Sequence, residues 1–185
     1  MGKVMSEIDG PLRTFIEEQH LYFIATAPVS ADGHVNLSPK GYGDTFSVID
    51  PTTVAYLDLT GSGAESIAHL RENGRIVIMF CAFDGRPRIV RLHGRGRVIT
   101  PMESEWESLS KHFPHRPSAR AIVLVDVTRV SSSCGQAVPT YEFVSDRDLL
   151  LQWADRKSPE DLDEYHRTRN AVSIDGLPGL PIKPE

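Results

Sequence analysis

The sequence predicts a small, mainly antiparallel β-barrel with flanking helices, an α+β fold of the mainly β kind. Six or seven strand-like segments follow one another through short connections, and helix-like segments are confined to connections and chain ends. At 185 residues the chain is long enough for one sizeable core and short for two. These observations favour a single antiparallel barrel over a doubly wound parallel sheet.

The first half of the chain is predicted to contain one helix and two hairpins. Apolar residues at helical spacing or in short buried runs define these elements: a helix over 12–19 and strands over 21–26, 34–40, 45–49 and 53–59. The pair Asp32-Gly33 is a strong signal for a short turn. Asp50-Pro51 marks a second turn, so consecutive strands are expected to pair antiparallel.

The second half continues the sheet and then becomes helical. The predicted elements are a short helix over 67–71, strands over 75–83, 88–100 and 121–130, a helix starting at 101, helices over 146–154 and 159–170, and an extended tail over 174–185. Asn73-Gly74 is a good left-handed helix end. The strand over 88–100 alternates arginines with apolar residues, which predicts one cationic face.

Composition limits the class of protein. An apolar fraction of 40%, with no run long enough to span a bilayer, predicts a soluble chain with no membrane partner. The N-terminus lacks a secretory pattern, and two cysteines do not make a disulfide framework, so we expect a cytoplasmic location. A net charge of −5 argues against nucleic acid as a partner.

The most informative segment runs from Tyr56, Leu57 and Asp58 into a glycine-rich loop. In that loop Thr60, Gly61, Ser62 and Gly63 precede a helix that includes Ser66. Backbone N–H groups at a helix N-terminus, with hydroxyls beside them, suit a phosphate group. The alternative is that the glycines only turn the chain while Thr60 or Ser62 caps the helix.

Two further segments supply cations. Ser38, Pro39, Lys40 and Gly41 close a strand, and a proline there indicates an edge strand or a bulge, where a ligand meets unpaired backbone. Arg88 and Arg91 begin the arginine-rich strand, and arginine binds phosphate or carboxylate through two parallel hydrogen bonds. The alternatives are a solvent-facing lysine and a strand face paired with some of the 25 acidic residues.

Several chemistries lack their motifs. The loop matches neither the Walker pattern nor the full Rossmann spacing, which disfavours triphosphate hydrolysis. The chain has no HExxH, CxxC or GxSxG pattern, so neither a metal site nor a serine nucleophile is predicted. No catalytic residue can be assigned from the sequence.

The order of these elements resembles a known family. A strand ending Tyr-Leu-Asp, a Thr/Ser/Gly loop, a short helix, then Glu72-Asn73-Gly74-Arg75 and an apolar strand is similar to the pyridoxamine 5′-phosphate oxidase-like flavin-binding proteins. The resemblance covers residues 12–130. It implies a six-stranded antiparallel split barrel that dimerises and binds FMN at the subunit interface.

By position, the resemblance implies a set of cofactor contacts. These are Ser38, Pro39, Lys40, Gly41, Tyr56, Leu57, Asp58, Thr60, Gly61, Ser62, Gly63, Ser66, Arg88 and Arg91, with the arginines acting partly in the partner subunit. Where the oxidases carry Arg-Lys at the helix start, this chain has Glu65-Ser66, so two phosphate cations are missing. A deazaflavin is therefore an alternative cofactor.

The C-terminal region also departs from the oxidases. They end in a strand with a Trp and an Arg-x-His substrate clamp, whereas this chain runs through Trp153, Tyr165, Arg167 and Arg169 to a Pro/Gly-rich end. Pyridoxamine phosphate is therefore not the expected substrate. We divide the chain into an FMN-binding split-barrel domain, 1–145, and a helical arm with an extended tail, 146–185, which we expect to pack across the dimer.

The functional hypothesis is an FMN-dependent oxidoreductase that transfers a hydride to or from a small molecule the sequence does not identify. Two alternatives stay open at this point. One is a deazaflavin-dependent reductase, and the other is a homodimer that binds a flavin or another small molecule without turnover.

Overall fold

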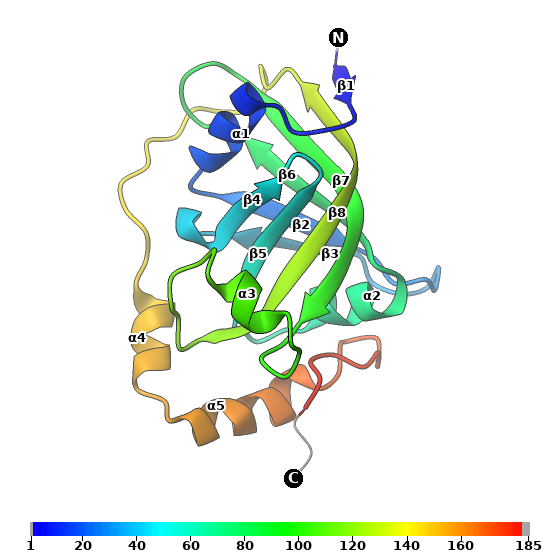
Figure 1. Cartoon of the computed structure of the whole chain (residues 1–185), viewed down its shortest axis with the longest axis vertical. Helices are drawn as coiled ribbons and strands as arrows, with labels where there is room; N and C mark the ends of the chain where they lie inside the picture. Colours follow the sequence, from blue (N-terminus) through cyan, green and yellow to red (C-terminus); the bar gives the residue numbers. More distant parts are fainter. Residues whose placement is uncertain (1, 183–185) are drawn as a thin grey trace.

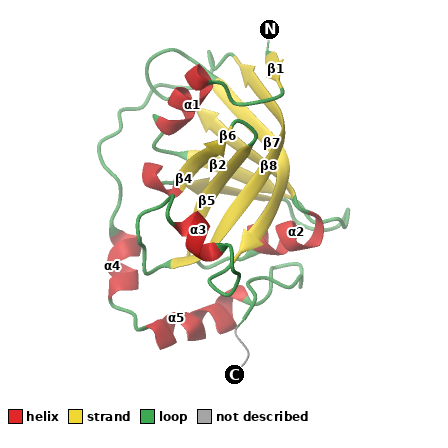
Figure 2. Ribbon diagram, in the orientation of Figure 1, coloured by secondary structure: helices red, strands yellow, loops and turns green. Residues whose placement is uncertain are grey.

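The computed structural model describes residues 2–182, which form one curled antiparallel sheet flanked by short helices (Figures 1 and 2). In chain order the elements are β1 (Lys3–Met5), α1 (Gly10–Glu17), β2 (Tyr22–Thr26), β3 (Asn36–Lys40), the 3₁₀ turn η1 (Gly43–Thr45), β4 (Phe46–Asp50), β5 (Thr53–Leu59), α2 (Glu65–Asn73), β6 (Arg75–Cys81), β7 (Ile89–Ile99), α3 (Trp106–Ser110), β8 (Ala119–Ser133), α4 (Leu149–Asp155), α5 (Pro159–Tyr165) and the π-helical turn η2 (His166–Asn170).

The sheet confirms the predicted antiparallel, mainly β fold. Its strands pair in the order β3-β2-β6-β7-β8-β5-β4, and β1 adds to β8. The described chain has eight strands, where the family resemblance implied six and the sequence pattern six or seven. All seven predicted strand segments form, and β1, which pairs with the long β8, is the additional strand. No pairing joins the terminal strands β3 and β4 within residues 2–182, so the sheet curls without closing along this seam.

Alternation along the strands places the core inside the curl. In β2, Tyr22 and Ile24 are buried while Phe23 and Ala25 between them are half-exposed, as the period of two requires. The rings of Tyr22 and Tyr56 meet at 6.2 Å, so β2 and β5 face each other across the interior. Helix α1 adds Leu12 and Ile16 to the same core.

Most predicted element boundaries agree with the structure to within about three residues. The predicted left-handed end of α2 is confirmed, since Gly74 has φ 69° and its N–H donates to the Leu70 carbonyl at 2.9 Å. The helix expected from residue 101 begins only at Trp106. Its first turn is lost because the Glu103 carboxylate accepts a hydrogen bond from the Thr100 N–H at 2.7 Å and holds a turn there.

The C-terminal segment lies across one end of the barrel (Figure 1). Asn170 donates to the Gly61 carbonyl at 2.9 Å, and buried Leu180 packs with Ile67 and Ala121. The segment therefore packs on its own barrel. Its predicted extended form is wrong around Gly176, where φ is 78° and the chain turns back toward Ser173; residues 183–185 of that prediction lie outside the described chain.

Candidate functional site

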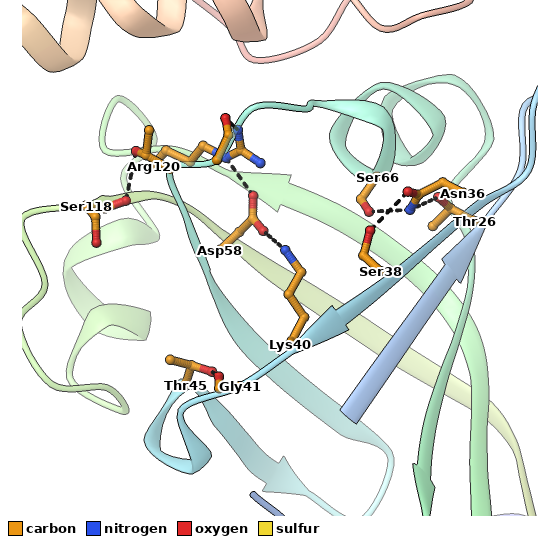
Figure 3. A network of polar contacts seen from close by, with 12 residues as sticks. Thr26, Asn36, Ser38, Lys40, Gly41, Thr45, Asp58, Ser66, Ser118 and Arg120 are labelled. Carbon is orange, nitrogen blue, oxygen red and sulfur yellow. Dashed lines mark hydrogen bonds and ion pairs between the residues drawn. The ribbon is translucent and has the colours of Figure 1, made fainter. Parts of the chain in front are cut away.

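An ion cluster joins the edge strand β3 to β5 and β8. Lys40, at the end of β3, places its ammonium 2.6 Å from Asp58 Oδ1, and Arg120 Nε on β8 lies 2.8 Å from Asp58 Oδ2 (Figure 3). The Asp58 side chain is 1% exposed and that of Arg120 is 5% exposed. Strands β3 and β5 stand near opposite ends of the pairing order, so this contact spans the curl of the sheet.

The cluster carries one positive charge in excess. Burial alone would raise the pKa of Asp58, but the charges of Arg120 and Lys40 outweigh it and lower that pKa to about 2. The carboxylate is therefore ionised at neutral pH. Because two cations surround one carboxylate, the cluster attracts an anion.

Beside this cluster lies a cleft of about 250 Å³. Its lining includes six of the fourteen predicted cofactor contacts, namely Pro39, Lys40, Gly41, Leu57, Thr60 and Gly61, together with Tyr42, Thr45, Leu59 and Leu150. Tyr42 has φ 58°, the one positive φ of a non-glycine residue in the described chain, and its ring lies 5.4 Å from the Arg116 guanidinium. The structure thus brings the end of β3 and the glycine-rich loop together in one cleft, as the sequence predicted.

The glycine-rich loop is anchored at one end and has unused donors at the other. The Thr60 N–H and hydroxyl both donate to the Ser118 carbonyl, at 2.6 and 2.9 Å. The N–H groups of Gly61, Ser62 and Gly63 make no hydrogen bond within residues 2–182. These donors precede α2, as an anion site at a helix start requires.

Glu65 changes what the helix start can bind. A Cβ placed on Gly63 would collide with the Glu65 carboxylate, so this acid folds back over the loop. It also accepts a hydrogen bond from the Ile174 N–H at 3.3 Å. A phosphate directly above Gly63 would meet a negative charge, which leaves the Lys40 side of the loop as the place for an anion.

A second polar cluster continues along the same face of β3. Ser38 Oγ donates to Asn36 Oδ1 at 3.0 Å, and Asn36 Nδ2 donates to Ser66 Oγ at 2.9 Å (Figure 3). Beyond them, the hydroxyl of Thr26 lies 3.0 Å from Nδ1 of His69, whose pKa is lowered mainly by burial. Ser38 and Ser66, both predicted site residues, therefore belong to one network.

Tyr56 and Leu57 point to opposite sides of β5. Leu57 lines the cleft, whereas Tyr56 is fully buried in the core, with a hydroxyl that has no partner among the described residues. The Lys40 ammonium lies 5.9 Å from the centre of the Tyr56 ring. Tyr56 therefore does not line the cleft, and it contributes there only through a cation–π contact between its ring and the Lys40 ammonium.

Arg88 and Arg91 lie elsewhere. Arg88 Nε donates to Ser132 Oγ at 3.1 Å and Arg91 Nη1 to Ser133 Oγ at 3.3 Å. Arg88 lines a groove of about 650 Å³ that shares no lining residue with the Lys40 cleft. Within residues 2–182 neither arginine has a carboxylate at ion-pair distance. One chain by itself does not bring these arginines to Lys40.

Arg120, Asn36 and Asn170 belong to the site but were not predicted from the sequence. A signal existed for two of them. Arg120 is the one charged residue among seven in the buried stretch Ala-Arg-Ala-Ile-Val-Leu-Val, where a cation needs a partner. Asn36 shares the period-two face of Ser38 and Lys40. Nothing in the sequence indicated that Asn170 returns to the loop.

The curled antiparallel sheet, open along one seam and lined there by Lys40 and the glycine-rich loop, is the fold of the split-barrel proteins. The sequence profile described as pyridoxamine 5′-phosphate oxidase matches residues 8–134. The chain belongs to the pyridoxamine 5′-phosphate oxidase family. This confirms the family that the sequence resemblance indicated.

Individual relatives agree with this assignment. The pyridoxamine 5′-phosphate oxidase family protein ustO of Aspergillus flavus is 40% identical over 185 aligned residues, which cover 91% of this chain and 74% of that protein. Two crystal structures of HupZ from Group A Streptococcus share the fold. One has a TM-score of 0.54 at 22% identity and covers 68% of this chain and 99% of its own. The other has 0.53 at 20%, covering 73% and 99%. No helix among residues 2–182 is long and apolar enough to cross a membrane.

Proposed function

We propose that the protein binds FMN noncovalently in a homodimer and works as a flavin-dependent oxidoreductase on a small molecule. The observation that carries the proposal is the cleft in which Lys40 and the loop residues Thr60 and Gly61 meet, beside an ion cluster with one excess positive charge. Family membership supports the same proposal. We further propose a cytoplasmic location, supported by two free cysteines, Cys81 and Cys134.

The residues of the cleft fit a flavin phosphate in charge and in donors. The excess positive charge and the unused N–H groups of Gly61 and Ser62 replace part of the missing Arg-Lys pair. Since the Glu65 carboxylate covers Gly63, we assign the phosphate to the Lys40 side of the loop. Ser38 and Ser66, linked through Asn36, would then offer hydroxyls to the polar chain of the cofactor.

A second subunit would complete the site. Among residues 2–182 neither Arg88 nor Arg91 has a carboxylate at ion-pair distance, and Arg88 lies in a groove separate from the Lys40 cleft. Within one sheet, β2 and β6 separate β3 from β7. In a two-fold dimer the partner presents an identical arginine groove, and we propose that this groove faces the Lys40 cleft of the first subunit.

When bound, FMN would supply hydride transfer, and the protein would supply orientation and electrostatics. Lys40 would stabilise negative charge on the cofactor while Asp58 keeps its ammonium in place. The proposed substrate is not pyridoxamine phosphate. Trp153 packs edge-on against Tyr165 at 5.2 Å and Arg167 pairs with Glu164 at 2.7 Å, so these C-terminal side chains are engaged with one another.

One observation favours a binding protein without turnover as the second candidate. The cleft contains two ionisable side chains among the described residues, Lys40 and Tyr42, and burial raises the pKa of Tyr42 first among several effects. Neither is a histidine or a carboxylate, the groups that most often serve as general acid or base. If NADH or NADPH reduces the bound flavin no faster than free FMN, this second candidate is the better one.

The proposal is tested by titrating the purified protein with FMN, riboflavin and a deazaflavin, following the quenching of flavin fluorescence. We expect one FMN per chain, bound at least about tenfold more tightly than riboflavin, because a charged phosphate contributes about 1.5–3 kcal/mol through its hydrogen bonds. Equal affinity for FMN and riboflavin would show that the protein has no site for the phosphate. Preference for the deazaflavin would replace FMN by the alternative cofactor.

A further inference from the structure

A hollow on the outside of the barrel is lined mainly by aromatic side chains. It has a volume of about 600 Å³ and lies where residues 140–143, between β8 and α4, meet the turn that follows β6. In Figure 1 the segment between β8 and α4 runs along the outside of the barrel. The aromatic and charged side chains of the lining are His20, Phe83, Asp84, Tyr141, Glu142 and Phe143. The hollow shares no lining residue with the Lys40 cleft or with the groove of Arg88.

Fixed contacts hold the aromatic rings of the hollow in place. The Tyr141 N–H donates to the Phe83 carbonyl at 2.8 Å, and the rings of these two residues lie 5.7 Å apart with their planes at 49°. His20 and Phe143 stack at 3.7 Å with their planes 8° apart. The backbone hydrogen bond and the stacked pair together attach residues 140–143 to the barrel. The rings are therefore positioned before a ligand arrives, which lowers the cost of binding one.

The aromatic faces of the hollow are exposed and carry no cation of the described chain. Tyr141 is 64% exposed and Phe143 is 48% exposed. The cation–π contacts within residues 2–182 use other rings, those of Phe15, Tyr42 and Tyr56. Because the face of an aromatic ring is negatively polarised, it attracts a cation within about 6 Å of its centre. The hollow can therefore bind a cation that comes from solution.

Two carboxylates add negative charge to the aromatic lining. Asp84 and Glu142 both line the hollow, and neither forms an ion pair within residues 2–182. The lining contains no Lys or Arg. Arg86, two residues after Asp84, lines the neighbouring groove of Arg88 instead. With His20 uncharged, the hollow therefore carries two negative charges that attract a cation to the rings.

Aromatic faces favour a cation that has no N–H donors. A primary ammonium is strongly hydrated, and it loses part of that water without replacing the hydrogen bonds when it moves onto a ring. A quaternary ammonium has no N–H to leave unpaired, and its methyl groups pack directly against ring faces. The two carboxylates attract it without requiring a fixed direction of approach. The chemistry of the lining therefore selects a quaternary ammonium over a primary one.

We propose that this hollow binds a small quaternary ammonium compound, with its methylated nitrogen against the rings of Phe83 and Tyr141 and its charge balanced by Asp84 and Glu142. A volume of about 600 Å³ holds a trimethylammonium group and a short polar body attached to it. The site is independent of the proposed flavin function, because it shares no lining residue with the Lys40 cleft.

The test is a two-dimensional amide NMR titration of the whole protein with choline, its neutral carbon analogue dimethylbutanol, and ethanolamine. Choline is expected to shift resonances of residues 83–85 and 140–143, and to bind about fivefold or more tightly than dimethylbutanol, which has the same shape without the charge. Ethanolamine, a primary ammonium, is expected to bind more weakly than choline. Shifts confined to other surfaces, or binding of either comparison compound as tight as that of choline, would overturn the proposal.

Matched variants locate the site. Glu142→Gln is expected to weaken choline binding about threefold, whereas Glu107→Gln, the same change of charge at an exposed position of α3, leaves it unchanged. Tyr141→Leu removes a ring face and should weaken binding about threefold, while Tyr141→Phe keeps that face and should bind like the unmodified protein. Because Tyr141 is 64% exposed, both of its variants are expected to give a folded amide spectrum. If the two glutamate variants bind choline equally, or if Tyr141→Leu binds it like the unmodified protein, the hollow is not its site.

Discussion

Lys40, on the edge strand β3, forms a 2.6 Å ion pair with Asp58 near the end of β5, on the opposite side of the curled sheet. Arg120 holds the second oxygen of the same carboxylate at 2.8 Å. The cluster therefore does two things. It ties the seam of the split barrel together, and it leaves one positive charge at the cleft.

Removing the Asp58 charge is expected to destabilise the fold. Asp58→Asn would leave the buried Arg120, and the partly exposed Lys40, without a carboxylate, and breaking a buried ion pair in this way costs about 3 kcal/mol or more. Urea unfolding measures the change, with Asp126→Asn on the exposed face of β8 as control. A loss below about 1 kcal/mol would show that the cluster is not structural.

Lys40 is expected to contribute more to FMN binding than to the stability of the fold. Lys40→Met leaves the Asp58–Arg120 pair in place, so the protein should remain folded. FMN affinity should fall about tenfold or more through loss of a charged contact. Exposed Lys111→Met is the matched control, and equal FMN affinities for these two variants would exclude Lys40 from the site.

The partner's arginine groove makes a separate prediction. Arg88→Gln, a change in the lining of the groove, should weaken FMN binding about tenfold if the groove of one subunit faces the cleft of the other. Arg129→Gln, on the exposed face of β8, should not. Sedimentation velocity on both variants distinguishes loss of a cofactor contact from loss of the dimer, and a wild-type protein that sediments as a monomer would contradict the shared site.

Acid is expected to destabilise the protein. The pKa values of His69 and His166 are lowered, mainly by burial, and that of Asp58 is lowered to about 2 despite burial. Below pH 6.5 the unfolded histidines bind protons that the folded ones do not, so stability decreases as the pH falls; Asp58 adds a further loss below about pH 4. Thermal unfolding from pH 8 to 4 measures this. His166→Gln, which retains a donor toward Thr60, should reduce the loss of stability between about pH 6.5 and 5. If that loss is unchanged in the variant, a group other than His166 causes it.

Gly94 is expected to tolerate no side chain. A Cβ there would collide with the backbone carbonyl of Asp126, at the bulge between β7 and β8. Gly94→Ala should cost about 2 kcal/mol of stability or more, as overpacking against a fixed backbone does. Gly10→Ala, which meets no atom within 4 Å, is the control in the same thermal scan.

The sequence predicted the secondary-structure elements better than the tertiary contacts between them. Strand alternation and turn signals located β2 to β8 because burial on one face imposes a period of two. Strand β1 was not predicted, because a strand of three residues is too short to show an alternating pattern. The cleft was predicted in its main parts, since Lys40 and the glycine-rich loop were both singled out and both line it.

The rest of the site depends on tertiary contacts that local patterns do not encode. Arg120 belongs to the site because β8 pairs with β5, while the curl of the sheet brings Lys40 of β3 to the same Asp58 carboxylate. Asn170 belongs to it because the chain returns to the loop from far along the sequence. Arg88 and Lys40 line separate hollows of one chain, which no local pattern in the sequence indicated.

The central claim is that the seam of this split barrel holds a flavin nucleotide. The most direct measurement is the visible absorption spectrum of the protein purified after expression and dialysed with excess FMN. The account predicts a yellow protein that retains about one flavin per chain. A colourless protein that releases all added FMN on dialysis would contradict it.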